Sequence, residues 1–109
     1  MDGIKIVKID EHNIPMKASA ASPRLYRTVF GGDLFLEFKE IKEAFEKGEK
    51  FDLGVIENMA YLFAYQANEE IEDIDTWLDK FSIAAIYKAI PQIVELWEDN
   101  SKTKSKAKK

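Results

Sequence analysis

The stretch from Leu53 to Ala67 constrains the fold most, because a helix built from it is apolar around most of its circumference. A helix of this kind is buried on several sides, either by its own domain or by a neighbouring subunit. With Asp52 as its N-cap, the stretch predicts the central helix of the fold. Its apolar residues are Leu53, Val55, Ile56, Met59, Ala60, Leu62, Phe63 and Ala64.

Helix-boundary residues divide the segment before this helix into two further helices. Ser22 can cap a helix and Pro23 suits its first turn, so a short helix is predicted from here through Phe30 and is ended by Gly31-Gly32. Asp33 is then a cap for a second helix, from Leu34 to about Lys47, which Gly48 ends. Spacings of three and four residues make this second helix amphipathic, with a stripe of Leu34, Phe38, Ile41 and Phe45.

The last third of the chain predicts a short helix and a long one. An acidic loop, 68–73, precedes Asp75, which is predicted to cap a turn of helix that carries Trp77 and Leu78. Ser82 is a cap candidate for a final helix from Ile83 to about Glu98. Pro91 removes one backbone hydrogen bond and should kink or split that helix near Ile90. The predicted apolar stripe of the final helix is Ile83, Ile86, Ile90, Val94 and Trp97.

The N-terminal segment is predicted to be extended. The β-branched run Ile4 to Ile9, the turn formers Asp10 to Asn13 and the run Ile14 to Ala18 predict a hairpin or a short extended segment, with Pro15 at an edge. A two-stranded hairpin is only marginally stable by itself, so the two strands are expected to pack on the helices. Residues 1–100 of the 109 therefore predict a mainly α, small single-domain fold of four to five helices with a short N-terminal β-hairpin or extended segment, followed by a disordered C-terminal tail, 101–109.

Charge separates the body from the tail. Residues 1–100 hold 11 basic and 20 acidic side chains, whereas the tail carries five lysines and no large apolar residue. The tail cannot offset the entropy cost of ordering, so it is expected to be a disordered solvated end, or to contact acidic proteins, RNA, DNA or its own acidic body. The acidic body argues against nucleic acid as the main partner.

Motifs of catalysis and metal binding are missing from the sequence. The chain has no cysteine and one histidine, and it lacks a phosphate-binding glycine loop and a G-x-S-x-G elbow. His12 is expected to be a surface residue of a turn. The acidic run 69–79 could bind a hard cation such as calcium, but it lacks the glycine and the ligand order of an EF-hand, which favours a solvated loop. The sequence therefore predicts no enzyme activity, no metal and no cofactor.

Hydropathy and the first residues bear on location. The longest apolar stretches, such as Met59 to Tyr65, are far shorter than the ~18 residues of a membrane-spanning helix. The first residues carry no apolar run that ends in a small-residue cleavage site, so secretion by a signal peptide is not expected. We expect a cytoplasmic protein with no membrane partner.

Aromatic and arginine residues supply the candidate binding surface. Phe35, Leu36, Tyr61 and Tyr65 lie off the main stripes of their helices, which predicts apolar surface for self-association or for a partner. Near Tyr26, two arginines form either a cationic anchor for a partner or salt bridges within the acidic body. The candidate residues are Arg24, Tyr26, Arg27, Leu34, Phe35, Phe38, Tyr61 and Tyr65.

Four segments also resemble a known family. The string Lys17-Ala-Ser-Ala-Ala-Ser-Pro-Arg-Leu-Tyr-Arg-Thr-Val-Phe-Gly-Gly-Asp33, followed by Glu57-Asn-Met-Ala-Tyr-Leu-Phe-Ala64, resembles tail assembly chaperones of long-tailed phages and prophages of Gram-positive bacteria. Trp77-Leu-Asp-Lys-Phe81 and Ile90-Pro-Gln-Ile-Val-Glu-Leu-Trp97 look like the closing segments of that family. The resemblance covers roughly residues 4 to 98 and transfers no residue-level site.

The resemblance implies a non-enzymatic assembly factor. Such a factor binds the tape measure protein while tail tube protein subunits polymerise around it, and it is absent from the mature virion. It would act in the cytoplasm of the bacterial host, and we expect it to be a homo-oligomer. The alternative is a small regulatory or nucleic-acid-binding protein whose lysine tail contacts phosphate.

Overall fold

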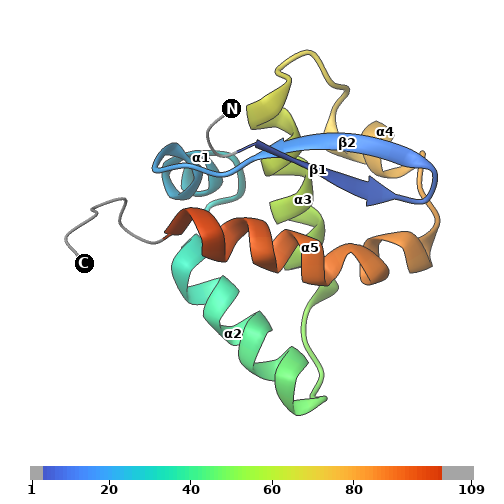
Figure 1. Ribbon diagram of the computed structural model, residues 1–109. Helices are drawn as coiled ribbons and strands as arrows, with labels where there is room; N and C mark the ends of the chain where they lie inside the picture. The colour runs from blue at the N-terminus through green and yellow to red at the C-terminus, as the bar shows by residue number, and fades with distance from the viewer. Residues whose placement is uncertain (1–3, 102–109) are drawn as a thin grey trace, which may run out of the picture.

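Two antiparallel strands and then five helices make up residues 4–101, which are the residues that this computed structural model describes (Figure 1). This arrangement confirms the mainly helical fold with an N-terminal hairpin. The predictions for residues 102–109 of the tail lie outside the described residues. The elements are β1 (Ile4–Ile9), β2 (His12–Lys17), α1 (Ala21–Phe30), α2 (Leu34–Lys47), α3 (Leu53–Ala67), α4 (Ile74–Leu78) and α5 (Ile83–Ser101).

The hairpin is tightly turned and is tied to the start of α5. Its register runs from Ile4 opposite Lys17 to Ile9 opposite His12, so the turn is shorter than the predicted 10–13 segment and His12 belongs to β2. Asp10 occupies the left-handed region, with a φ of 56°, which aspartate tolerates better than most residues. Its carboxylate accepts hydrogen bonds from the backbone N–H of Ser82 at 2.8 Å and from the Ser82 hydroxyl at 3.1 Å.

Helix α3 lies at the centre of the domain. It packs against β2, α1, α4 and α5, while β1 packs against α5 (Figure 1). The apolar residues of α3 are therefore buried by its own domain. The sequence had allowed burial either by its own domain or by a neighbouring subunit. The buried side chains of α3 are Ile56, Met59, Ala60, Leu62, Phe63 and Ala64.

Most of the predicted helix boundaries are confirmed. The carboxylate of Asp33 accepts a hydrogen bond from the N–H of Leu36 at 3.2 Å, and that of Asp52 accepts one from Gly54 at 2.8 Å. The Ser82 hydroxyl accepts one from Ala85 at 3.2 Å. Helices α1 and α2 end at two glycines with left-handed φ angles of 80° and 70°, Gly31 and Gly48.

Two of the predicted caps are wrong. Ser22 lies inside α1, fully buried, where its hydroxyl accepts from the N–H of Ser19 and donates to Gln66 of α3. A buried hydroxyl requires a partner, and here it cross-links two helices instead of capping one. Helix α4 is capped by Asp73, two residues before the predicted cap, through hydrogen bonds from the N–H and hydroxyl of Thr76.

Helix α5 also differs from its prediction. It runs without a break through Pro91 to Ser101, so the proline does not split it. Ile83, predicted in the apolar stripe, is 87% exposed because the first residue of α5 lies beyond the end of the core. The buried stripe consists of Ala85, Ile86, Ala89, Ile90, Ile93, Leu96 and Trp97.

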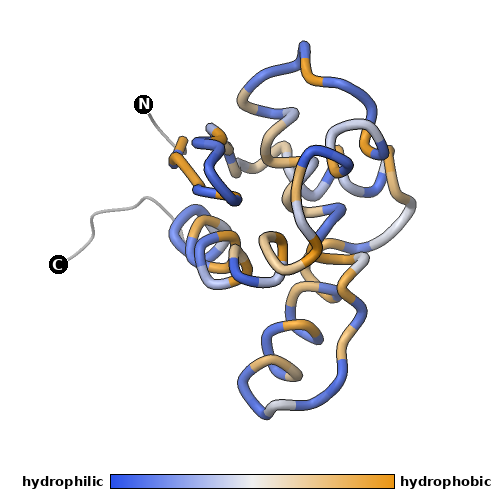
Figure 2. Tube along the Cα trace, turned by 90° about the vertical axis from the view of Figure 1, so that its right-hand side faces the viewer, coloured by the Kyte–Doolittle hydropathy of each residue, from blue (hydrophilic) through white to orange (hydrophobic). Residues whose placement is uncertain are grey.

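Helix α2 extends away from the rest of the chain. In Figure 2, α2 and the segment after it form a lobe below the body. Trp97 of α5 links this lobe to the core, since its ring lies 5.1 Å from that of Phe35, 5.8 Å from Phe38 and 6.3 Å from Phe63 of α3, between ring centroids. Beyond this contact, a groove lies between the second half of α2 and α5, bridged by the Lys42–Glu98 ion pair.

Candidate functional site

The structure divides the predicted binding surface into buried and exposed residues. Tyr26, Leu34 and Phe38 are buried, which corrects the prediction that they contribute to a binding surface. Tyr26 shares the inward face of α1 with Ser22, and the tight turn at 31–33 brings the first turn of α2 back onto the core.

Tyr61 and Tyr65 are half-buried on α3, with their rings stacked at 6.4 Å. The Tyr61 hydroxyl donates a hydrogen bond to the backbone carbonyl of Glu72 at 2.6 Å, so this ring lies beneath the loop 68–73. Phe35, by contrast, is 56% exposed, and both Arg24 and Arg27 are exposed. The structure therefore leaves Phe35 and the two arginines as the accessible members of the predicted surface.

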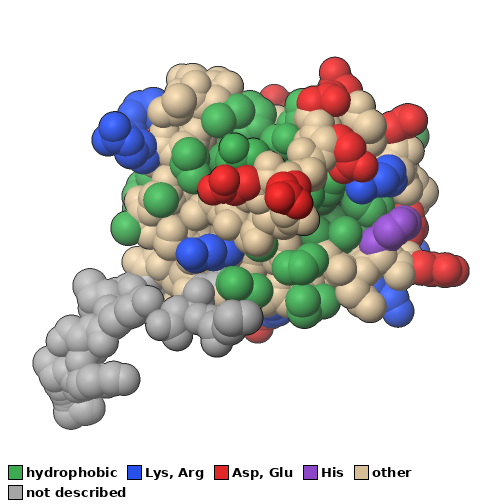
Figure 3. Space-filling model, turned by 90° about the horizontal axis from the view of Figure 1, so that it is seen from above, with side chains coloured by type: hydrophobic (Ala, Val, Ile, Leu, Met, Phe, Trp, Pro, Cys, Tyr) green, Lys and Arg blue, Asp and Glu red, His purple; other side chains and the backbone are tan. Residues whose placement is uncertain are grey.

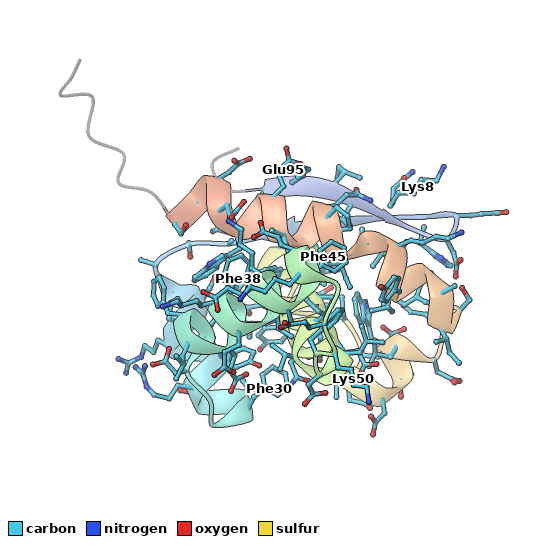
Figure 4. The ribbon with its side chains drawn as sticks, turned by 90° about the horizontal axis from the view of Figure 1, so that it is seen from below. Lys8, Phe30, Phe38, Phe45, Lys50 and Glu95 are labelled. Carbon is cyan, nitrogen blue, oxygen red and sulfur yellow. The ribbon has the colours of Figure 1, made fainter. Side chains whose placement is uncertain are left out.

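A groove of about 470 Å³ separates the second half of α2 from α5. Figure 4 shows the labelled Phe38 and Phe45 between the ribbons of these two helices. Ion pairs from Lys42 to Glu98 and from Lys5 to Glu95 join α2 and β1, respectively, to α5. The groove is lined by Lys42, Phe45, Glu46, Pro91, Val94, Glu95 and Glu98.

Three aromatic rings extend this groove along the surface. Phe45 lies 6.0 Å from Phe51 and 6.4 Å from Tyr87, and Phe51 stacks on Tyr87 at 6.3 Å. Tyr87 is 53% exposed and Phe45 37%. Partly exposed aromatic residues of this kind are typical anchors of interfaces.

The sequence pattern assigned Val94 to the core stripe of α5 and overlooked Tyr87 and Pro91, although a signal for this side of the groove was present. Tyr87, Pro91 and Val94 recur at spacings of four and three residues, which places them on one face of α5. This face is distinct from the buried stripe that includes Ile90 and Trp97. A second apolar stripe on the same helix is the pattern of a helix that faces both a core and a partner.

Within residues 4–101, no group of three histidine, cysteine or carboxylate side chains is placed to hold a metal ion. Glu72 pairs with Lys80 at 3.1 Å, and Asp73 caps α4. His12 is exposed, as expected, although it lies in β2 with its ring edge-on to Phe81 at 5.2 Å. Within the same described range, no helix combines the length and the apolar character that spanning a bilayer requires.

Tyr26 makes a partly buried contact with a carboxylate, and the effect of this tyrosine on stability depends on pH. Its hydroxyl donates to the Glu37 carboxylate at 2.6 Å. Burial, and next this hydrogen bond, raise the pKa of Tyr26 well above its usual value of 10.0. The unfolded chain loses the phenol proton near its usual pKa, whereas the folded chain keeps it.

We therefore expect the free energy of unfolding to be unaffected by this group below about pH 10 and to fall as the pH rises beyond it. Tyr26→Phe should make that fall shallower, because phenylalanine has no proton to lose. Urea unfolding of both proteins between about pH 9 and 11 measures the difference in slope. Equal slopes for the two proteins would contradict the raised pKa.

Comparison of the chain with protein-family models, with curated proteins and with solved structures finds no match.

Proposed function

We propose that the chain is a non-enzymatic assembly chaperone that holds an amphipathic helix of its client in the groove between α2 and α5. The observation that carries this proposal is the separation of α2 from α5, which leaves Phe45, Pro91 and Val94 as an open apolar floor. Helical segments bind in grooves of this kind through apolar residues that recur every three or four positions.

The charges on the rim indicate the chemistry of the client helix. Three carboxylates and one ammonium line the rim, but Glu98 pairs with Lys42 and Glu95 pairs with Lys5. Glu46 is therefore the rim carboxylate that forms no ion pair within residues 4–101. A client helix with one lysine or arginine beside its apolar stripe would complement Glu46. The groove is open at the surface, so a client can bind and leave without unfolding of the chaperone.

The resemblance to tail assembly chaperones suggests which client this is. In that family the client is the tape measure protein, around which tail tube subunits polymerise. The proposed client offers amphipathic helices that the groove covers before the tube forms. On this proposal, the chain covers such helices during assembly in the host cytoplasm and does not remain in the mature virion.

The first test is whether a long tape-measure-like gene lies immediately downstream of this one. Binding of the chain to the product of that gene is then measured. Phe45→Ser combined with Tyr87→Ser removes two rings of the groove, and we expect it to weaken binding at least tenfold, about 1.4 kcal/mol. Ile6→Ser is the control, because Ile6 is apolar and exposed to the same extent as Tyr87 but lies on the hairpin. Binding is measured by calorimetry, with circular dichroism to show that each variant keeps its helices.

Three outcomes would contradict parts of this proposal. Unchanged binding by the double variant would exclude the groove as the client site. Absence of binding by the unchanged chain would exclude this client. Binding of RNA or DNA at physiological salt that is lost when residues 101–109 are deleted would instead favour the nucleic-acid alternative.

A further inference from the structure

The β1–β2 hairpin has one face in the core and one face outside it. Alternate residues of a strand share a face, so the register of the two strands assigns every side chain of the hairpin to one side or the other. The inner face includes Val7, Ile9 and Met16, which are buried where the hairpin packs against α3 and α5. The outer face consists of Ile4, Ile6, Lys8, Asn13, Pro15 and Lys17.

The centre of this outer face is apolar. Ile6 is 55% exposed and lies directly opposite Pro15, which is also exposed, and Ile4 follows Ile6 on the same side of β1. In Figure 3, which shows the molecule from above, green apolar side chains are exposed beside the purple His12 at the start of β2. Apolar residues that adjoin one another on a surface are a feature of interaction sites.

Two lysines flank the apolar centre. Lys8 lies near the turn on β1, whereas Lys17 lies at the open end of β2. Neither lysine forms an ion pair within residues 4–101. The outer face contains no acidic residue, although residues 1–100 hold 20 acidic and only 11 basic side chains. It is therefore a positively charged area on an acidic domain, and it complements carboxylates of a partner.

The edges of the hairpin are less suited to a partner than its outer face. On β1, the backbone N–H of Lys8 already donates to the side chain of Gln92 in α5, at 3.3 Å. On β2, Pro15 has no N–H, which interrupts the hydrogen bonds that an added strand requires. Addition of a third strand is thus disfavoured on both sides, and a partner is better accommodated as a helix that lies on the outer face.

We propose that the outer face of the hairpin binds an amphipathic helix of a second protein, whose apolar stripe is flanked by glutamate or aspartate. The stripe covers Ile6 and Pro15, and two carboxylates pair with Lys8 and Lys17. Four residues of strand separate the levels of the two lysines, which is about 13 Å. The same length corresponds to about nine residues of helix, so the two carboxylates lie about nine residues apart.

This site goes beyond the proposed function and is separate from the α2–α5 groove. The groove is proposed to accept a helix with a basic residue for Glu46, whereas the hairpin accepts a helix with carboxylates. The two surfaces therefore select partners of opposite charge. One chain can then hold its client in the groove and a second, acidic protein on the hairpin.

Two synthetic peptides of about 20 residues, long enough to form a helix, test the site. Both have the same leucine stripe, and the acidic peptide has two glutamates about nine residues apart where the basic peptide has lysines. We expect the acidic peptide to bind at least tenfold more tightly and to shift the NMR signals of the amides of residues 4–17. The variant K8E/K17E should reverse this preference, and Ile6→Ser should weaken binding of the acidic peptide.

K39E/K47E is the matched control, because it makes the same change of net charge at two exposed lysines of α2. It should leave binding of the acidic peptide unchanged. The Phe45→Ser/Tyr87→Ser variant should do so too, which distinguishes failure of this site from failure of the groove. Circular dichroism verifies that each variant keeps its helices.

Three results would overturn the proposal. The first is equal binding of the two peptides by the unchanged chain. The second is a K8E/K17E variant that binds the acidic peptide as tightly as the unchanged chain does. The third is binding of phosphatidylserine vesicles without binding of the acidic peptide, which would assign the outer face to a membrane surface instead.

Discussion

Replacing Trp97 with alanine is expected to lower the free energy of unfolding by about 3–5 kcal/mol. The side chain is 4% exposed and contacts the rings of Phe35, Phe38 and Phe63. Because Trp97 contacts two aromatic residues of α2, we also expect its loss to loosen the packing of α2, although α2 keeps its contacts with α1 and α3 and the Lys42–Glu98 ion pair. Urea unfolding measures the first effect, and hydrogen exchange, faster in 34–47 than in 53–67, measures the second.

Phe35→Ala is the matched control for this change. Phe35 contacts the same tryptophan but is 56% exposed, so its truncation should cost about 1 kcal/mol or less. If Trp97→Ala were no more costly than Phe35→Ala, Trp97 would not be the link between α2 and the core. Equal exchange rates in both helices would lead to the same conclusion.

Replacing Trp77 with alanine is expected to cost a similar amount, about 3–5 kcal/mol, for a different reason. Trp77 is 1% exposed, and its ring lies 5.6 Å from Tyr61 and 5.0 Å from Phe81. It anchors the five-residue helix α4, which is too short to be stable by itself. Urea unfolding and the near-ultraviolet circular dichroism of the aromatic cluster measure the loss.

Ile83→Ser is the control for the Trp77 variant, since Ile83 is apolar, lies six residues further along and is almost fully exposed. We expect its effect on stability to be within about 0.5 kcal/mol. A Trp77→Ala variant as stable as Ile83→Ser would show that α4 is held by contacts other than this ring.

Local chemistry made most helix boundaries predictable. A carboxylate such as Asp33 or Asp52 caps a helix by accepting from an N–H two or three residues ahead, so partner and cap lie close together in the sequence. Gly48 ends α2 for an equally local reason, its positive φ. The cap of α4 was misplaced because Asp73 and Asp75 are both suitable and lie in the same short acidic run.

The candidate site was predictable only in part. Periodicity placed Phe35 off the stripe of α2, and this residue is exposed. It could not show that Tyr26 turns inward, because that depends on Glu37 of the next helix, which accepts its hydroxyl. Tyr87 was overlooked because one stripe of α5 had already been assigned to the core.

The sequence by itself determined the helices, the hairpin, the central place of α3 and the acidic character of the body, because propensity, capping and hydrophobic period act over a few neighbouring residues. Only the tertiary structure decided that a groove lies between α2 and α5, that Pro91 does not split a helix and that Ile83 lies outside the core. These features depend on the angles and distances between elements, which are set by packing among side chains far apart in the chain. Trp97 is the clearest example, since its contacts with Phe35 and Phe63 span three helices.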